Sequence, residues 1–260
     1  MAPPTAQRYN FRMHESVSRT GQPGLRTPAA TVEIEKKLGN VMSPRKLFVA
    51  LLALFGCARG DAGGYLPDGH VLFQPDNEAF QARAPDEYRV RVSTTEGEFT
   101  IHVVREWAPH GADRFYNLVR NGYYDGVYFF RVVGGFVAQF GVHGDPRVND
   151  AWMRERIPDD PVVLSNVRGV VTFAAAGPET RTTQVFINLR DNSHLDADGF
   201  APIGRVVEGM GVVDRLFAGY GETKPEGRGP DPVRYMERGN PYIEQDYPSL
   251  DRIETATIVE

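Results

Sequence analysis

The sequence is poor in three things that often identify a protein class: cysteine, long apolar runs and charge of one sign. One cysteine in 260 residues excludes an intrachain disulfide and argues against a zinc site. The uninterrupted apolar run at 47–55 has nine residues, whereas a membrane-spanning helix needs about 20. A formal net charge of −5 gives no reason to expect a nucleic-acid partner. With 41% hydrophobic and 24% charged residues, the composition is typical of a soluble globular protein.

The apolar run and the cysteine have an informative order. Met42 begins a short basic segment, the nine apolar residues follow, and Cys57 ends the stretch. This order is typical of a signal peptide over 42–57, and its end resembles a bacterial lipobox, where the chain is cut before a lipid-carrying cysteine. We therefore expect lipidation of Cys57. A secreted protein without lipid and an incidental hydrophobic segment are the alternatives, since Phe55 departs from the small or branched residue usual there.

Two further segments lack the periodicity of folded elements. Residues 1–41 are rich in Pro, Gly, Ser and Thr, and we expect a non-native or disordered extension ahead of the true start at Met42. Residues 58–87 are rich in Gly, Pro, Asp and Ala, which bury too little apolar area to offset the entropy of ordering. We expect 58–87 to be a flexible tether and 88–260 to be the folded domain.

The domain reads mainly as β-structure. Residues 88–92 and 99–103 alternate with the period of two that strands require, on either side of a Glu96-Gly97 turn. Helices are expected from Pro109 to Gly122 and over 210–217. Further strand-like runs are 125–141, 170–174, 184–189, 203–206 and 253–259. Many short strands with two helices predict a closed antiparallel eight-stranded barrel capped by two helices.

One segment fits this architecture poorly. Residues 219–249 hold five Gly and five Pro, and a structureless connection of that length is uncommon inside a compact domain. We expect a long loop insertion before the closing strand, in which 235–238 can form a helical turn.

The stretch DGVYFFRVVGGFVAQFG at 125–141 is the most specific feature. Two runs of strand length flank Gly134-Gly135, which predicts a β-hairpin with a two-residue turn. Arg131 lies in an otherwise apolar strand, and its guanidinium keeps its charge there. It must therefore pair with a carboxylate, extend to the surface, or face a cleft.

Two motifs in order and register identify a family. FFRVV-x-GF at 129–136 is followed by AGP-x-T-x-x-x-Q-x-FI at 176–187. This arrangement resembles the cyclophilin family of peptidyl-prolyl cis-trans isomerases, in detail its divergent bacterial branch, over 88–217 and the final strand. The resemblance implies a cyclophilin-like barrel and an enzyme that accelerates X-Pro isomerisation in proline-containing polypeptides. It needs no cofactor, metal or nucleophile, and no Gly-x-Ser-x-Gly motif is present.

The resemblance also implies the site residues. Arg131 would stabilise the twisted amide, and Gln139 would orient either the substrate backbone or Arg131. The residues implied to bind substrate are Phe136, Val137, Phe186, Leu195 and Phe200 around the proline ring, Ala174 and Ala175 at the floor, Gln184 beside Phe186, and His194 at the rim.

Some positions depart from the family. Val137 replaces the usual methionine and Phe200 the usual histidine, whereas His194 stands where cyclosporin-binding members carry tryptophan. We therefore expect an isomerase that is insensitive to cyclosporin. Each aromatic also has core packing as its alternative.

Two functions stay open at this point. The first is a monomeric isomerase of exported proteins, in the bacterial cell envelope and lipid-anchored to a membrane that faces the periplasm or the exterior. The second is a non-catalytic peptide-binding chaperone or assembly module that uses the same groove.

Overall fold

The computed structural model describes residues 65–259, which fold around an eight-stranded antiparallel sheet in the order β3-β4-β6-β5-β7-β2-β1-β8. The expected extension 1–41, the signal peptide 42–57 and Cys57 lie outside the described residues. The strands are β1 Glu87–Thr94, β2 Gly97–Val104, β3 Arg131–Val133, β4 Val137–Phe140, β5 Val170–Phe173, β6 Val185–Asn188, β7 Pro202–Glu208 and β8 Ile253–Val259.

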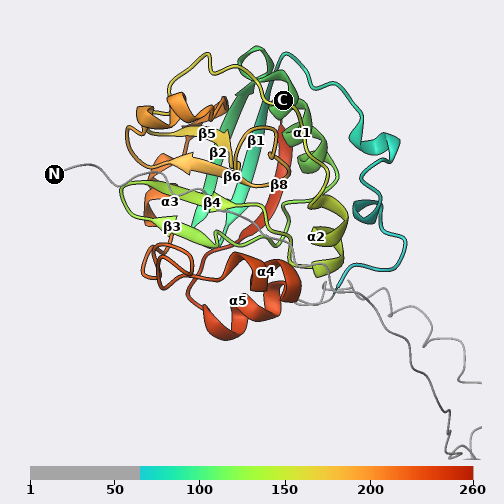
Figure 1. Ribbon diagram of the computed structural model, residues 1–260, viewed down its shortest axis with the longest axis vertical. Coiled ribbons are helices and arrows are strands. Elements are labelled where there is room, and N and C mark those ends of the chain that lie inside the picture. The colour runs from blue at the N-terminus through green and yellow to red at the C-terminus, as the bar shows by residue number, and fades with distance from the viewer. Residues whose placement is uncertain (1–64, 260) are drawn as a thin grey trace, which may run out of the picture. The chain divides into compact units, whose positions relative to one another are not determined.

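The sheet closes on itself, although its end strands β3 and β8 do not pair directly. The residues just before β3 close it instead: the Gly126 N–H donates to the Ile253 carbonyl at 2.9 Å, and the Phe129 N–H to the Asp251 carbonyl at 2.9 Å. An isolated bridge joins Tyr128 to Arg252. In Figure 1 the strands β3, β4 and β6 cross β1, β2 and β8 at a steep angle. The predicted mainly β barrel is thus confirmed.

The core forms because the strands alternate as the sequence predicts. In β1 the inward residues Tyr88, Val90 and Val92 are buried and their neighbours face solvent. The helix α1 (Pro109–Arg120) covers the core with an apolar stripe and ends as expected at Gly122, which has a φ of +70°. The second predicted helix is α3 (Met210–Arg215).

The hairpin between β3 and β4 differs from the prediction in its turn. Val133 pairs with Val137, so residues 134–136 lie in the turn, which has three residues in place of the expected two. Gly135 adopts the left-handed conformation, with a φ of +67°, and the Phe136 N–H donates to the Val133 carbonyl at 2.9 Å. The longer turn moves Phe136 out of the strand.

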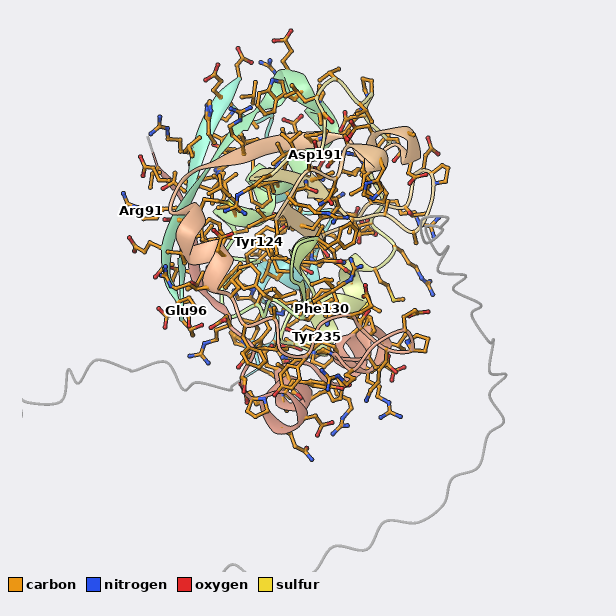
Figure 2. The ribbon with its side chains drawn as sticks, turned by 90° about the vertical axis from the view of Figure 1, so that its left-hand side faces the viewer. Arg91, Glu96, Tyr124, Phe130, Asp191 and Tyr235 are labelled. Carbon is orange, nitrogen blue, oxygen red and sulfur yellow. The ribbon has the colours of Figure 1, made fainter. Side chains whose placement is uncertain are left out.

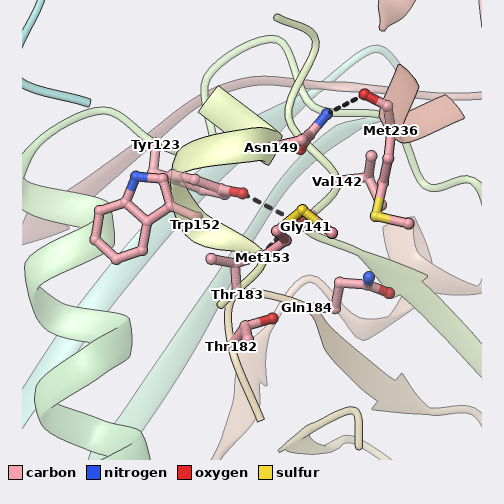
Figure 3. Close-up of a pocket in the computed structure, with 10 residues that line it drawn as sticks. All are labelled: Tyr123, Gly141, Val142, Asn149, Trp152, Met153, Thr182, Thr183, Gln184 and Met236. Atoms are coloured by element: carbon pink, nitrogen blue, oxygen red, sulfur yellow. Dashed lines mark hydrogen bonds between the residues drawn. The ribbon is translucent and has the colours of Figure 1, made fainter. Parts of the chain in front are cut away.

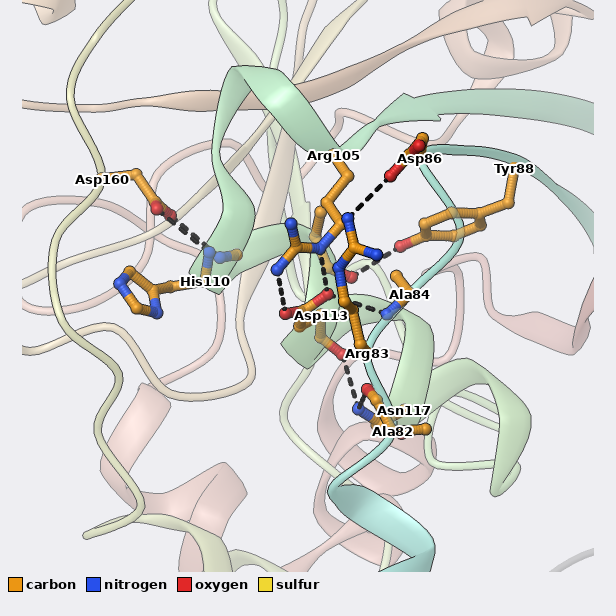
Figure 4. A network of polar contacts seen from close by, with 12 residues as sticks. Ala82, Arg83, Ala84, Asp86, Tyr88, Arg105, His110, Asp113, Asn117 and Asp160 are labelled. Atoms are coloured by element: carbon orange, nitrogen blue, oxygen red, sulfur yellow. Dashed lines mark hydrogen bonds and ion pairs between the residues drawn. The ribbon is translucent and has the colours of Figure 1, made fainter.

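The expectation of a tether is wrong for residues 65–86, which we call the N-terminal arm. The arm buries Leu72, Phe80 and Ala84 in the main core. Asp113 of α1 accepts hydrogen bonds from the Ala84 N–H at 2.8 Å and from the Arg105 guanidinium at 2.8 Å (Figure 4). Three spaced apolar residues and the hydrogen bond from Ala84 hold a segment whose average composition predicts disorder. The short helices of the arm are 3-10 turns at Val71–Phe73 and Glu78–Phe80.

Residues 219–250, which we call the C-terminal excursion, are also folded. They contain α4 (Pro232–Arg238), which confirms the predicted helical turn, and α5 (Asn240–Asp246), and both lie beside β3 in Figure 1. Phe130 and Tyr235 contact across this junction with ring centroids 5.9 Å apart (Figure 2). The excursion builds an apolar cluster from Tyr128, Phe130, Val142, Tyr235, Tyr242, Ile243, Tyr247 and Leu250.

Two helices are therefore too few to describe the barrel. Besides α1 and α3, the described residues include α4, α5 and α2 (Pro146–Trp152), which starts at the Asp145-Pro146 pair of the connection after β4. Each of these three short helices has a proline in its first turn, and α2 and α4 are capped by the side chains of Asp145 and Asp231. None of the helices within 65–259 has the length and apolar character to span a membrane.

Candidate active site

The strand register brings three of the predicted site residues into one row. Arg131 of β3 lies directly opposite Gln139 of β4, and Gln139 lies directly opposite Phe186 of β6. Opposed residues point to the same face of a sheet, and their neighbours Val132 and Ala138 are buried in the main core. The row therefore lies on the outer face of the barrel wall, away from the core.

Side-chain hydrogen bonds run along this face. Arg131 Nη1 donates to Gln139 Oε1 at 3.0 Å, and Gln139 Nε2 donates to Gln184 Oε1 at 3.0 Å. Between the two roles left open for Gln139, the contact with Arg131 favours orienting the guanidinium.

The sequence did not predict the strongest partner of Arg131. Glu222 of the C-terminal excursion accepts from Arg131 Nε at 2.6 Å and from Nη2 at 2.7 Å, a bidentate ion pair. The two side chains are 21% and 29% exposed, so the pair is shielded but reachable. Burial raises the pKa of the Glu222 carboxyl, but the hydrogen bonds and charge of Arg131 outweigh it and hold that pKa below its usual value.

Beside this cation lies an apolar cluster separate from the main core. Its buried members are Val137, Phe186 and Leu195, and its partly buried members are Phe136, Ala174 and Phe200. All six are residues that the sequence assigned to substrate binding. The Arg131 guanidinium carbon lies 5.5 Å from the centre of the Phe136 ring, and the rings of Phe186 and Phe200 meet edge to face at 5.8 Å. The arrangement joins an apolar surface to a fixed positive charge.

The remaining predicted residues lie around this cluster. His194 is exposed and stacks on Phe136 with ring centroids 6.3 Å apart, which places it at the rim. The Ala174 N–H donates to the Gln184 carbonyl at 2.9 Å, while Ala175 is half-buried one residue beyond. Every predicted site residue within 65–259 thus lies on or next to the same outer face.

The amino-acid sequence also matches that of a known enzyme family. The sequence pattern of the cyclophilin type peptidyl-prolyl cis-trans isomerases matches residues 89–234, more than half of the chain. The chain belongs to this family. It is therefore an enzyme of the isomerase class.

Individual relatives agree with this assignment. A peptidyl-prolyl cis-trans isomerase of Acinetobacter baylyi is 33% identical over 138 residues, which cover 49% of this chain and 70% of the relative. The isomerase ppi1 of Schizosaccharomyces pombe is 35% identical over 132 residues, covering 49% and 83%. Among solved structures, a Cryptosporidium parvum cyclophilin type isomerase matches with a TM-score of 0.50 at 18% identity, over 67% of this chain and 98% of the other. That likeness concerns the fold alone.

In this cyclophilin domain a buried polar network, which sequence reasoning missed, supports the apolar cluster. Asn192 Nδ2 donates to the Phe136 carbonyl at 2.9 Å, and Asn166 Nδ2 donates to the Phe200 carbonyl at 2.8 Å. Asn166 also donates to Asp196, in the turn that carries Leu195. Burial raises the pKa of Asp196, but the hydrogen bonds from the Ser165 hydroxyl and from Asn166 outweigh it and lower that pKa. Single asparagines spaced along loops carry no periodic signal.

Gln184, which accepts a hydrogen bond from Gln139, also lines a small pocket (Figure 3). Its volume of about 20 Å³ leaves room for roughly one water molecule and not for a proline ring. Asn149 Nδ2 donates to the Met236 carbonyl at 3.1 Å and thereby links α2 to the C-terminal excursion. The residues that line the pocket are Tyr123, Gly141, Val142, Asn149, Trp152, Met153, Thr182, Thr183, Gln184 and Met236.

Proposed function

We propose that this protein accelerates X-Pro isomerisation in exported proteins, with Arg131 stabilising the twisted amide while the apolar cluster holds the proline ring. The observation that carries the proposal is the fixed guanidinium beside that cluster. Three of the five N–H groups of Arg131 donate to Glu222 and Gln139, which leaves two for a substrate.

The chemistry requires no bond to break. Amide resonance sets a barrier of about 18–20 kcal/mol, and rotation of the X-Pro bond returns a lone pair to the amide nitrogen. A guanidinium N–H that donates to this nitrogen binds the twisted amide better than the planar one, and differential binding of this kind lowers the barrier. Removing about 7 kcal/mol would give a factor of roughly 10⁵.

The surrounding residues supply the other requirements. Phe136, Phe186 and Leu195 present apolar surface to the proline ring and exclude water from it. The floor at Ala174 has a small side chain, so a substrate backbone can run close to the main chain there. Gln139 and Glu222 hold the guanidinium in place, so it need not reorganise during rotation.

A protease-coupled assay on an X-Pro peptide tests this proposal. The full chain is expected to accelerate isomerisation, and Arg131→Ala is expected to lower kcat/KM at least tenfold without unfolding the protein. Equal rates for the two proteins would remove the role assigned to Arg131. Peptide binding by wild type without any acceleration would favour the chaperone or assembly module.

We further propose that the protein acts in the bacterial cell envelope, anchored through lipid on Cys57. The basic segment after Met42, the nine-residue apolar run and the cysteine support this proposal. In a bacterial host, protein started at Met42 is expected to incorporate labelled fatty acid and to fractionate with membranes, and Cys57→Ser is expected to abolish the label. A mature protein that begins at another residue would refute lipidation.

A further inference from the structure

The C-terminal excursion reaches the active site along the free edge of β3. Gly221 forms an isolated bridge with Val132, the residue after Arg131, and so extends the sheet by one pair. This bridge brings the next residue, Glu222, alongside the Arg131 side chain. The edge of the sheet therefore sets the position of Glu222, although 91 residues separate it from Arg131.

The backbone around Glu222 is folded tightly. The Gly229 N–H donates to the Glu222 carbonyl at 2.7 Å, and the Gly227 N–H donates to the Thr223 carbonyl at 2.8 Å. A Cβ at Gly227 would overlap the Glu222 backbone, so this turn requires the glycine. Tyr247 anchors the turn to the excursion, since its hydroxyl donates to the Gly229 carbonyl at 3.1 Å.

The carboxylate itself is held from two sides. Its Oε1 accepts from the Thr223 N–H at 2.9 Å and from the Thr223 hydroxyl at 3.2 Å, while both oxygens accept from Arg131. Glu222 occupies the Nε–Nη2 side of the guanidinium, and Gln139 binds Nη1. These contacts fix the plane of the guanidinium and leave one N–H on each terminal nitrogen.

We propose that Glu222 is a positioning residue for isomerisation, which acts through Arg131 by holding the guanidinium at the angle the twisted amide needs. This inference rests on the proposed function. An arginine side chain has several rotatable bonds, and without a second partner it must be ordered at each turnover. The contrary effect is that a carboxylate weakens a guanidinium as a donor. The fixed turn around Glu222 favours the positioning effect. Removing Glu222 lowers kcat if positioning dominates and raises kcat if the weakening of the donor dominates.

The test uses the full chain and measures kcat and KM separately. Glu222→Ala is expected to lower kcat about tenfold with KM changed less than threefold. The kcat of Glu222→Gln is expected to lie between those of the wild type and Glu222→Ala, because one acceptor oxygen remains. In an Arg131→Ala background, Glu222→Ala is expected to change nothing further, since the residue acts through Arg131. Glu237→Gln removes the same charge from an exposed site on α4 and serves as the matched control.

A second readout does not depend on turnover. The ¹⁵N–¹H signal of Arg131 Nε is expected to be sharp and protected from exchange in the wild type and in Glu237→Gln, and to broaden or vanish in Glu222→Ala. A rate that rises or stays unchanged in Glu222→Ala, in an active protein, overturns the positioning role alone. A wild type without isomerase activity overturns the proposed function and this role together, even where the Nε signal depends on Glu222.

Discussion

The N-terminal arm and the C-terminal excursion are both rich in proline and differ in what they do. The arm has three prolines and one glycine in 22 residues, the excursion has five of each in 32, and both fold against the barrel. The arm inserts Leu72 and Phe80 into the main core and bonds to α1 through Asp113. The excursion forms its own cluster and places Glu222 on Arg131. A proline-rich segment can therefore serve stability alone or stability together with the active site.

The largest expected effects come from removing one buried ring in each region. Tyr235 of the excursion is 0% exposed and Phe80 of the arm is 7% exposed. Tyr235→Ala and Phe80→Ala are each expected to lower the free energy of unfolding by about 3–5 kcal/mol, because each leaves a cavity. Only Tyr235→Ala is expected to reduce kcat of the folded protein as well. Denaturant titration with isomerase assays below the transition checks both values, and equal losses of kcat would erase the distinction.

A smaller effect is expected at the joint where the two regions meet. The Leu66 N–H of the arm donates to Asp145, and the Asn240 N–H of the excursion donates to the Gly144 carbonyl. His143 directly precedes Gly144 and Asp145 in the chain, and its Nδ1 accepts a hydrogen bond from the Asp145 N–H at 2.9 Å. Burial lowers the pKa of His143 from 6.5 to about 4, so the folded state keeps it neutral.

The sign of the pH dependence follows from that shift. Between pH 6.5 and about 4, His143 is protonated in the unfolded chain and neutral in the folded protein. The contribution of His143 to the free energy of unfolding is therefore largest above pH 6.5 and falls as the pH drops. The loss reaches about 3 kcal/mol. His143→Asn keeps an acceptor for the Asp145 N–H and cannot titrate, so it is expected to flatten the fall in denaturation curves across this window. An unchanged slope would assign the acid sensitivity to other groups.

The smallest effect is expected at the rim, on a turn that belongs to neither region. His194 stacks on Phe136 but offers less apolar area than tryptophan. His194→Trp is expected to tighten cyclosporin at least tenfold, about 1.4 kcal/mol, with little change in kcat/KM or stability. Calorimetric titration of both proteins measures the affinity. A wild-type protein that binds cyclosporin with a nanomolar Kd would show that His194 does not limit the affinity for the drug.

The sequence predicted the features that depend on local pattern. Strand alternation located the barrel strands, and the family resemblance named Arg131, Gln139 and Phe186, which the strand register brings into one row. Contacts between distant segments were missed, because nothing in the spacing of residues 219–250 links Glu222 to β3. Average composition also misled, since a few well-spaced apolar residues such as Leu72 are enough to order the N-terminal arm.

The proposed mechanism requires Arg131 to bind the twisted amide better than the planar one. Exchange spectroscopy on an X-Pro peptide measures this directly, because it separates the rate of isomerisation on the enzyme from the affinity of the complex. Arg131→Ala is expected to slow exchange in the bound state at least tenfold while Kd changes less than threefold. A loss confined to Kd, with exchange in the bound state unchanged, would show that Arg131 binds the substrate without stabilising the twisted amide.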